Sequence, residues 1–332
     1  MPESPAISSS EIGALWMTYQ QKTMVMRMLE YFIEKADDAE AKGIMTGLYE
    51  DIHPYVAKIS HLFQSEGVPL PVGYTSDDVS KDAPRLYENG FDIMFLRIIK
   101  EISMAIHTLN LTMSYREDIM AIFRELTTIT QKCYDDCTRY LLEKGLLPRS
   151  PYVSTEQTVE FVKDRNYLGG FNPLSRKRPL NTLEIAHIYR AIDTNTLGMK
   201  MILGFAQAAK EDEVRKYFNK GGEIAKAVIK EMGEVLLKND IQVPATAGGN
   251  VTTSNASPFS DKMMMYCVSL FSSFSLGGNS VGTAFSLRHD LPAKLSIFMK
   301  DIAEYSHEGA SIMIRHGWLE EPPQTLKQTE KG

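Results

Sequence analysis

Cysteine is scarce in this sequence, with three residues in a chain of 332. Cys133 and Cys137 lie one helical turn apart and Cys267 stands alone. This pattern excludes an extracellular disulfide framework, which needs several paired cysteines in a short chain. The opening segment, MPESPAISSSEIG, has neither the basic region nor the apolar region of a secretory signal. We therefore expect a cytoplasmic protein.

Positive charge is also limited. Lysine and arginine together number 36 against 42 aspartates and glutamates, which gives a formal net charge of −6. Nucleic-acid-binding proteins usually carry an excess of basic side chains that neutralise phosphates. We therefore expect no nucleic-acid partner.

One stretch without charged residues, from Met263 to Leu287, is long enough to span a bilayer. It is nevertheless too polar for a membrane helix, because it contains Ser272, Ser273, Ser275, Gly277, Gly278, Asn279 and Ser280. We interpret the stretch as a buried helix of a bundle and expect no membrane span.

The most informative feature that is present is an internal repeat. Glu11-Ile12 recurs as Glu184-Ile185, a shift of 173 residues, and later the shift becomes 172, where SYRED at 114–118 matches SLRHD at 286–290. A chain of this length suits about two domains. We predict a first bundle at residues 1–148, a linker at 149–181 and a second bundle at 182–332.

Each copy of the repeat has the pattern of four helices. Capping-box sequences, Ser8-x-x-Glu11 and Asn181-x-x-Glu184, open the first helix of each copy. In the first copy a long irregular segment, GVPLPVGYTSDDVSKDAPRLYENG, separates the second helix from a third at about 91–113, and Gly145 ends the fourth. Two hairpins joined by a long crossover are typical of ferritin-like bundles. The predicted fold class is all-α, a tandem duplication of a ferritin-like four-helix bundle.

The first helix of each copy is apolar on two faces. Opposite the core stripe lie Met28, Leu29 and Phe32, which the repeat replaces with Met201, Ile202 and Phe205. A helix that is apolar on two faces is buried on both. The cover for this second stripe could be the crossover, the other bundle or a partner subunit, and we favour burial within the chain.

Metal sites of ferritin-like proteins use Glu-x-x-His pairs that point into the bundle. Three such pairs occur here: Glu50/His53, Glu184/His187 and Glu304/His307. At about 100° per residue, none of the three faces the core stripe of its helix. We therefore interpret all three pairs as parts of solvated faces.

Two other carboxylates are better placed. Glu30 is in phase with the core stripe of the first helix, and Glu101 lies on the flank of the stripe of the third helix, at a similar height. We favour carboxylates held by a hydroxyl or an arginine, and the alternative is a degenerate site for iron or another divalent metal. Their repeat mates, Leu203 and Ser273, carry no carboxylate, so the second bundle lacks this pair of candidate metal ligands. We predict no catalytic residue and no cofactor.

Two further patterns each have a functional and a structural interpretation. The Ser-x-Arg-x-Asp turn before the fourth helix of each copy could bind an anion or could cap the helix and bind a protein carboxylate. The thiols of Cys133 and Cys137 could bind a soft metal or could pack in the core. We favour the structural interpretation for both patterns.

Several distinctive strings resemble one known family: SEIGALWMTY, VPLPVGYTSDDVSKDAPRLY, RKRPLNTLEIAHIY, SPFSDKMMMY and IMIRHGWLEEPPQ. The chain resembles, over nearly its whole length, domain-of-unknown-function family 3231, duplicated ferritin-like proteins of spore-forming Bacillus-type bacteria. The resemblance implies the fold and a Firmicute source but assigns no activity. The family's looser kinship to spore coat protein F implies an association with the spore, by analogy of fold alone.

Three functional hypotheses follow. The leading one is a non-enzymatic structural or interaction protein, associated with sporulation, that binds itself or a protein partner. The second is a metal-binding or redox protein that uses Glu30 and Glu101. The third is a carrier of an apolar ligand in the second bundle, near Met263, Met264 and Met265, although methionine there also suits adaptable core packing.

Overall fold

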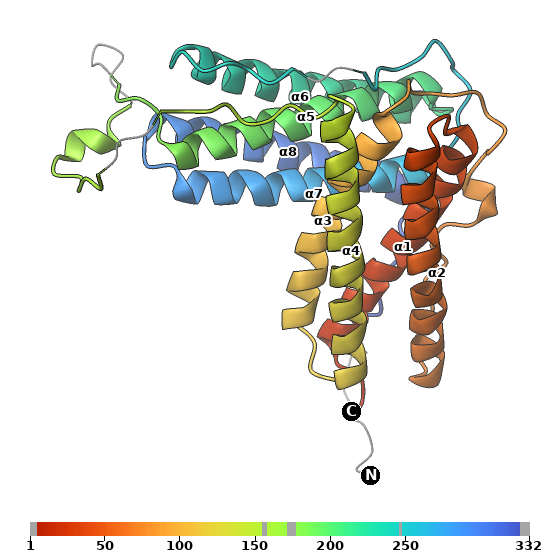
Figure 1. Ribbon diagram of the computed structural model, residues 1–332. Coiled ribbons are helices and arrows are strands. Elements are labelled where there is room, and N and C mark those ends of the chain that lie inside the picture. Colours follow the sequence, from red (N-terminus) through yellow and green to blue (C-terminus); the bar gives the residue numbers. More distant parts are fainter. Residues whose placement is uncertain (1–4, 155–157, 171–176, 246–247, 326–332) are drawn as a thin grey trace.

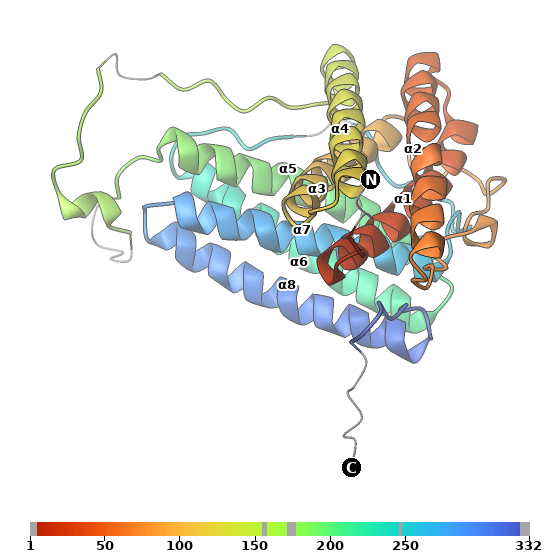
Figure 2. The ribbon, with the colours of Figure 1, turned by 90° about the horizontal axis from the view of Figure 1, so that it is seen from below.

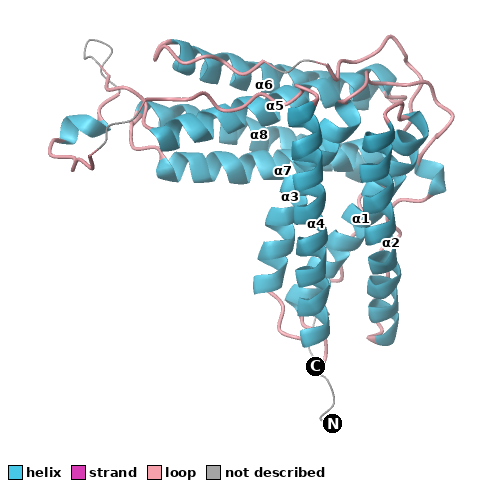
Figure 3. Ribbon diagram, in the orientation of Figure 1, coloured by secondary structure: helices cyan, strands magenta, loops and turns pink. Residues whose placement is uncertain are grey.

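The computed structural model describes residues 5–154, 158–170, 177–245 and 248–325, and within them the regular structure is helical, with no strand. Figure 1 shows two groups of four long helices that lie crosswise to one another, and Figure 3 shows the loops between them. The first bundle comprises α1 (Ser9–Lys35), α2 (Ala39–Ser65), α3 (Phe91–Thr112) and α4 (Glu117–Glu143). The second comprises α5 (Thr182–Ala208), α6 (Asp212–Leu237), α7 (Asp261–Phe285) and α8 (Asp290–Arg315).

The helix ends follow the expected chemistry. Ser8 and Asn181 each form a capping box, with Glu11 and Glu184 respectively, so both predicted starts are confirmed. α4 ends at Glu143, and Lys144 is its C-cap. Gly145 follows with a φ of 68°, as a glycine after a helix end commonly does. Local capping therefore sets these boundaries.

The connections alternate between short and long in both bundles. Residues 36–38 join α1 to α2 and residues 113–116 join α3 to α4, whereas α2 and α3 are joined by the first crossover, residues 66–90. The second bundle repeats this order with a second crossover, residues 238–260. The all-helical duplicated architecture is thus confirmed. The domain limits at 148 and 182 stay a prediction, and residues 1–4 and 326–332 lie outside the described residues.

The uncharged stretch at 263–287 forms most of α7, and its three consecutive methionines, Met263, Met264 and Met265, are buried in the hydrophobic core. The prediction of a bundle helix is confirmed, and its first half is buried, whereas Val281 and Phe285 near its end are exposed. Among the described residues, no helix combines the length and the apolarity that crossing a bilayer requires.

The two crossovers pair with each other. Val79 forms an antiparallel bridge with Phe259, and Tyr87 forms one with Val251. Val251 is the repeat mate of Val79, and Phe259 is the mate of Tyr87, each 172 residues later. The pairing therefore follows an approximate twofold relation between the halves of the chain.

One hydrophobic core runs through both bundles. The ring of Phe259 lies 5.2 Å from that of Tyr31, 6.1 Å from that of Phe32 and 6.3 Å from that of Phe205, measured between ring centroids. The second apolar stripes of α1 and α5 are buried in this core: Met28, Leu29, Phe32, Met201, Ile202 and Phe205. The cover of both stripes therefore lies within the chain, as the sequence favoured.

Each bundle also has an end that lies away from the other bundle. The free end of the second bundle holds the starts of α5 and α8 and the end of α7, and the free end of the first holds the end of α3 and the start of α4 (Figure 1). The described part of the linker after α4 runs along the second bundle to its free end (Figures 1 and 2). On the way, the Tyr189 hydroxyl donates a hydrogen bond to the carbonyl of Arg149 at 2.7 Å.

Tyr87 of the first crossover reaches α5 across a glycine. Its hydroxyl donates a hydrogen bond of 2.6 Å to the carbonyl of Met201, and a Cβ atom at Gly204 would lie 2.4 Å from its ring. A side chain at position 204 would therefore displace the tyrosine from the contact between the bundles.

We expect Gly204→Ala to lower the free energy of unfolding by about 1–3 kcal/mol, the usual cost of overpacking. Gly198→Ala on the same helix is the control, because nothing lies within 4 Å of a Cβ atom there. Alanine at that position should stabilise the helix by about 1 kcal/mol. Chemical denaturation of both variants measures the difference, and equal effects would contradict this account of Tyr87.

Candidate functional site

Glu30 and Glu101 each bind an arginine. Glu30 forms an ion pair of 2.7 Å with Arg27 and accepts a hydrogen bond of 3.2 Å from the Tyr49 hydroxyl. Glu101 forms an ion pair of 2.7 Å with Arg190 of α5 and so links the two bundles. These contacts agree with the interpretation of carboxylates held by an arginine or a hydroxyl. The use of the two carboxylates as metal ligands stays a prediction.

Of the three Glu-x-x-His pairs, Glu50/His53 and Glu304/His307 are exposed, as the phase argument expected. The argument is wrong for Glu184, whose side chain is fully buried. Its carboxylate lies at the first turn of α5 and accepts hydrogen bonds from the backbone amides of Leu287 and Arg288 at 3.2 and 3.0 Å. The phase of a helix describes burial against its side, whereas Glu184 is buried against the α7–α8 turn at the helix end.

The Ser-x-Arg-x-Asp turns bind protein carboxylates. Arg116 forms ion pairs with Asp118, at 2.7 Å, and with Glu66, and the repeat mate Arg288 forms one of 2.8 Å with Asp290. Glu11 accepts hydrogen bonds of 2.8 Å from the amides of Tyr115 and Arg116. These contacts support the binding of protein carboxylates at both turns. The predicted capping by Ser or Asp is wrong, because the N-cap residues of α4 and α8 are Arg116 and His289.

Glu11 is ionised at the joint that it holds. Burial alone would raise the pKa of Glu11, but hydrogen bonds from Ser8 and from the amides of Arg116 and Tyr115 outweigh burial and lower the pKa to about 2. The pKa of the equivalent Glu184 is also lowered, because hydrogen bonds from Arg178 and from backbone amides outweigh the effect of its burial. Each carboxylate thus fastens the start of its first helix to the turn before its fourth helix.

The interior of the first bundle contains a cluster of bases that the sequence analysis did not identify. Lys22 of α1 and Lys100 and His107 of α3 are fully buried. Lys22 Nζ lies 2.8 Å from His107 Nε2, and the Thr130 hydroxyl lies 3.3 Å from His107 Nδ1. Among the described residues, Lys100 Nζ has no hydrogen-bond partner. We call Lys22, Lys100 and His107 the buried base cluster.

The sequence did contain a signal for this cluster. Lys100 and His107 continue a heptad series of core positions on α3 that begins with Ile93 and Leu96, and Lys22 follows Leu15 by one heptad on α1. Such positions face a bundle interior whatever residue occupies them. Lysine is not a usual metal ligand, so the metal-binding patterns of carboxylates, paired histidines and thiols do not include these positions.

Burial disfavours the charged form of these bases. It lowers the pKa of Lys22 well below its ordinary value, and the charge of Lys100 lowers it further. Burial also lowers the pKa of Lys100 and lowers that of His107 well below the usual range. In the part of the chain that the structure describes, no group of three or more His, Cys, Asp or Glu side chains is placed to hold a metal ion.

The thiols of Cys133 and Cys137 are buried in the same core, with their sulfur atoms 3.9 Å apart. The hydrogen bond from Cys137 lowers the pKa of Cys133, and the thiol of Cys137 is correspondingly harder to ionise, with a raised pKa. Both side chains belong to the hydrophobic core cluster. Their burial agrees with the interpretation of packing thiols.

The second bundle does not repeat the base cluster. In the second copy of the repeat, Asn195, Ser272 and Asn279 stand at the positions of Lys22, Lys100 and His107 respectively. These three interior positions are therefore polar in both bundles, but in the second bundle they hold smaller, uncharged side chains.

A model of the family described as "Protein of unknown function (DUF3231)" matches residues 1–159 and 169–330. The two matched ranges correspond to the two copies of the repeat. No curated protein matches the chain. A solved structure from Bacillus halodurans C-125, described as a "putative spore coat protein", is similar over 45% of this chain and 98% of its own, with 16% sequence identity and a TM-score of 0.42.

We expect Lys100→Met to raise the free energy of unfolding by about 1–4 kcal/mol, because an apolar side chain of similar volume removes the cost of burying an ionisable group. Lys42→Met on α2 is the control, since Lys42 is exposed and such changes usually alter stability by less than about 0.5 kcal/mol. Chemical denaturation measures both. A loss of stability in Lys100→Met would show that this amine is charged and paired in the folded protein.

The same variant should reduce the dependence of stability on pH. Burial lowers the pKa of Lys100 in the folded protein, so below its ordinary pKa of 10.5 the unfolded chain binds the proton more readily. The free energy of unfolding of the parent protein therefore decreases as the pH falls from 10.5 towards the lowered pKa of the folded state. Lys22 contributes with the same sign in this range, and His107 does so only below its ordinary pKa of 6.5, so Lys100→Met should remove only part of the slope. Denaturation curves over this range, compared with Lys42→Met, provide the test.

The metal hypothesis has its own test. It predicts near-stoichiometric iron, manganese, zinc or copper in untagged protein purified without chelators, and it predicts loss of this metal in Glu30→Leu, which copies the second half. The favoured interpretation predicts metal-free protein even after anaerobic loading with iron. Elemental mass spectrometry distinguishes the two, and metal retained by Glu30→Leu would exclude Glu30 as a ligand.

Proposed function

Because the chain belongs to the DUF3231 family of proteins of unknown function, we propose from its own residues that it is a non-enzymatic structural protein that assembles through the free ends of its two bundles. The buried base cluster supports a non-enzymatic role. Its lysines and histidine are fully buried, whereas catalytic groups must reach a substrate.

We propose that both bundles are ferritin-like. The support is their connectivity, two hairpins joined by a long crossover, which is the order of that bundle class. In the first bundle α1 packs against α2 and α3, and α4 packs against the same two helices. The helices therefore surround a common interior, as a four-helix bundle requires.

One observation carries the proposed assembly. The free end of the first bundle exposes Leu109 and Tyr115, with exposed fractions of 58% and 75%. Their repeat mates at the free end of the second bundle, Val281 and Leu287, are exposed by 48% and 47%. Apolar side chains that are exposed at equivalent positions on two ends are better explained as a surface for protein contact than as scattered exposed residues.

The second free end offers additional apolar surface. Leu183, Phe285 and Ile297 are more than half exposed there. Because both ends present the same type of surface, the partner that fits them best is a second copy of this chain. A molecule with two such ends can bind two others, so contacts of this kind produce open assemblies when they do not close a ring.

We further propose a cytoplasmic location with association to the spore. This proposal rests on the resemblance to a family of spore-forming bacteria. Fractionation of sporulating cells with an antibody against the chain tests it, and recovery only from vegetative cells would contradict it.

We expect the parent protein to self-associate at micromolar concentration, and Leu109→Ser with Val281→Ser to weaken the association about tenfold or more, as loss of a central apolar contact does. Ile314→Ser is the matched control, because Ile314 is 64% exposed at the opposite end of α8. Sedimentation velocity over a concentration series measures the dissociation constant. A strictly monomeric parent protein, or an equal effect of Ile314→Ser, would refute assembly through the free ends.

A further inference from the structure

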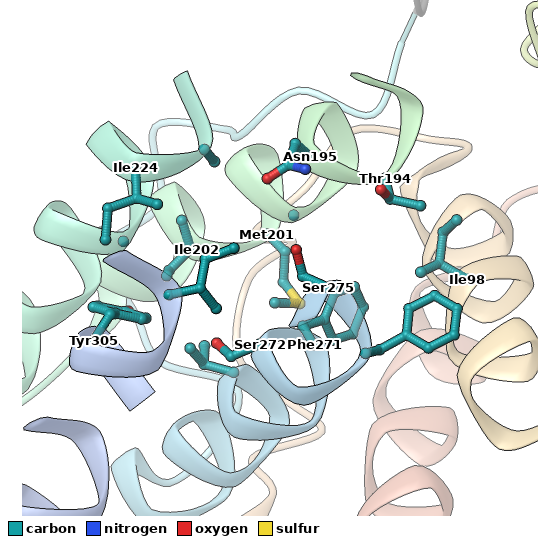
Figure 4. A pocket seen from close by; sticks show the side chains of 16 residues that line it. Ile98, Thr194, Asn195, Met201, Ile202, Ile224, Phe271, Ser272, Ser275 and Tyr305 are labelled. Atoms are coloured by element: carbon teal, nitrogen blue, oxygen red, sulfur yellow. The ribbon is translucent and has the colours of Figure 1, made fainter. Parts of the chain in front are cut away.

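The second bundle contains a cavity of about 90 Å³, partly open to solvent, at its contact with the first bundle. Its apolar walls come from all four helices of the second bundle and from one residue of α3 (Figure 4): Ile202, Ile224, Val268, Phe271, Tyr305 and Ile98. The cavity therefore spans the interior of the second bundle and reaches the junction between the two halves.

The cavity exists because small residues replace large ones at this level. Gly198 on α5, Gly221 on α6 and Ser272 on α7 line it. Their repeat mates in the first bundle are, in the same order, Val25, Leu48 and Lys100, all buried. The lysine stem and Val25 occupy in the first bundle the space that the second bundle leaves open at Ser272 and Gly198. Beside Gly221 the space is filled instead, because Tyr305 and Ile202 lie where a Cβ atom would be.

The polar groups at the cavity are uncharged. Of the described residues that line it, none is Asp, Glu, Lys, Arg or His. The Asn195 side-chain amide already donates to the carbonyl of Ala191 at 2.8 Å. The hydroxyls of Ser272 and Ser275 form no hydrogen bond with the described residues, so both are available to a ligand.

We propose that this cavity binds a small uncharged organic molecule with an apolar ring or short chain and one hydroxyl group. Ligand sites typically combine apolar walls with a few polar groups that fix orientation. An enclosed apolar cavity of about 150 Å³ binds benzene in another protein. This cavity is smaller but partly open to solvent, so a ligand with one ring and one small substituent need not be contained in it completely. The hydroxyl would bind Ser272 and Ser275, and the apolar part would contact Val268 and Phe271.

Phenol is a suitable probe, with benzoate as the charged comparison. We expect saturable binding of phenol to the full chain, seen by NMR chemical-shift changes, and no binding of benzoate, whose charge would be buried without a partner. Ser272→Met should reduce the affinity for phenol by about tenfold or more, because the side chain fills the cavity as its repeat mate Lys100 fills the first bundle. Ser273→Met is the control, since the neighbouring Ser273 is exposed.

A second variant keeps the test independent of repacking. Ser272→Ala with Ser275→Ala preserves the cavity and removes its hydroxyls, so phenol should lose affinity several-fold while benzene binding persists. Absence of phenol binding by the folded parent protein, or binding unchanged in both variants, would overturn the proposal. Loss of binding in Ser273→Met as well would place the phenol site outside the cavity and would equally overturn it.

Discussion

The antiparallel pairing of the two crossover segments is the constraint on which the rest of the structure depends. It places Phe259 among the rings of Tyr31, Phe32 and Phe205 and lets Tyr87 reach the backbone of α5. Because these contacts join residues of both halves, one core serves both bundles. The ion pair between Glu101 and Arg190 lies at the same junction. The long crossovers are thus structural elements that hold the halves together as well as connections within each bundle.

Duplication allowed the two bundle interiors to differ while the joints stayed alike. Glu11 and Glu184 bind the same turn amides in their respective halves, and the Arg116 and Arg288 ion pairs are equivalent. The interior level occupied by lysine and histidine in the first bundle holds only small uncharged residues in the second. An unpaired buried amine costs stability unless it is neutral, whereas a cavity costs the contacts that would have filled it. The first interior therefore loses stability through a buried amine and the second through a cavity. Both bundles tolerate this loss while the carboxylate and arginine contacts at the turn before the fourth helix stay the same.

Sequence reasoning recovered the parts of this protein that depend on local chemistry. Ser8, Asn181 and Gly145 signal helix ends through hydrogen bonds and backbone angles that their neighbours determine, and the repeat reveals the duplication directly. Sequence reasoning missed contacts between segments that are distant in the chain, such as the bridge between Val79 and Phe259. No local sequence pattern specifies which two irregular segments will pair. Sequence reasoning also misplaced Glu184, since helical phase ignores burial at a helix end. The base cluster was visible as a heptad series and was overlooked because lysine is rarely expected in a core.

The crosswise arrangement of the bundles bears on how the chain could meet its partners. The shared core occupies the inner part of each bundle, so the free ends are the parts that remain for contacts with other molecules (Figures 1 and 2). The two ends point in different directions, and a copy bound at one end leaves the other accessible. The cavity lies beside the middle of α7, between Val268 and Ser275 and near Ile98 of α3, whereas Leu287 follows the end of that helix. The proposed ligand site and the proposed assembly surface therefore consist of separate residues, so a variant of one leaves the residues of the other in place.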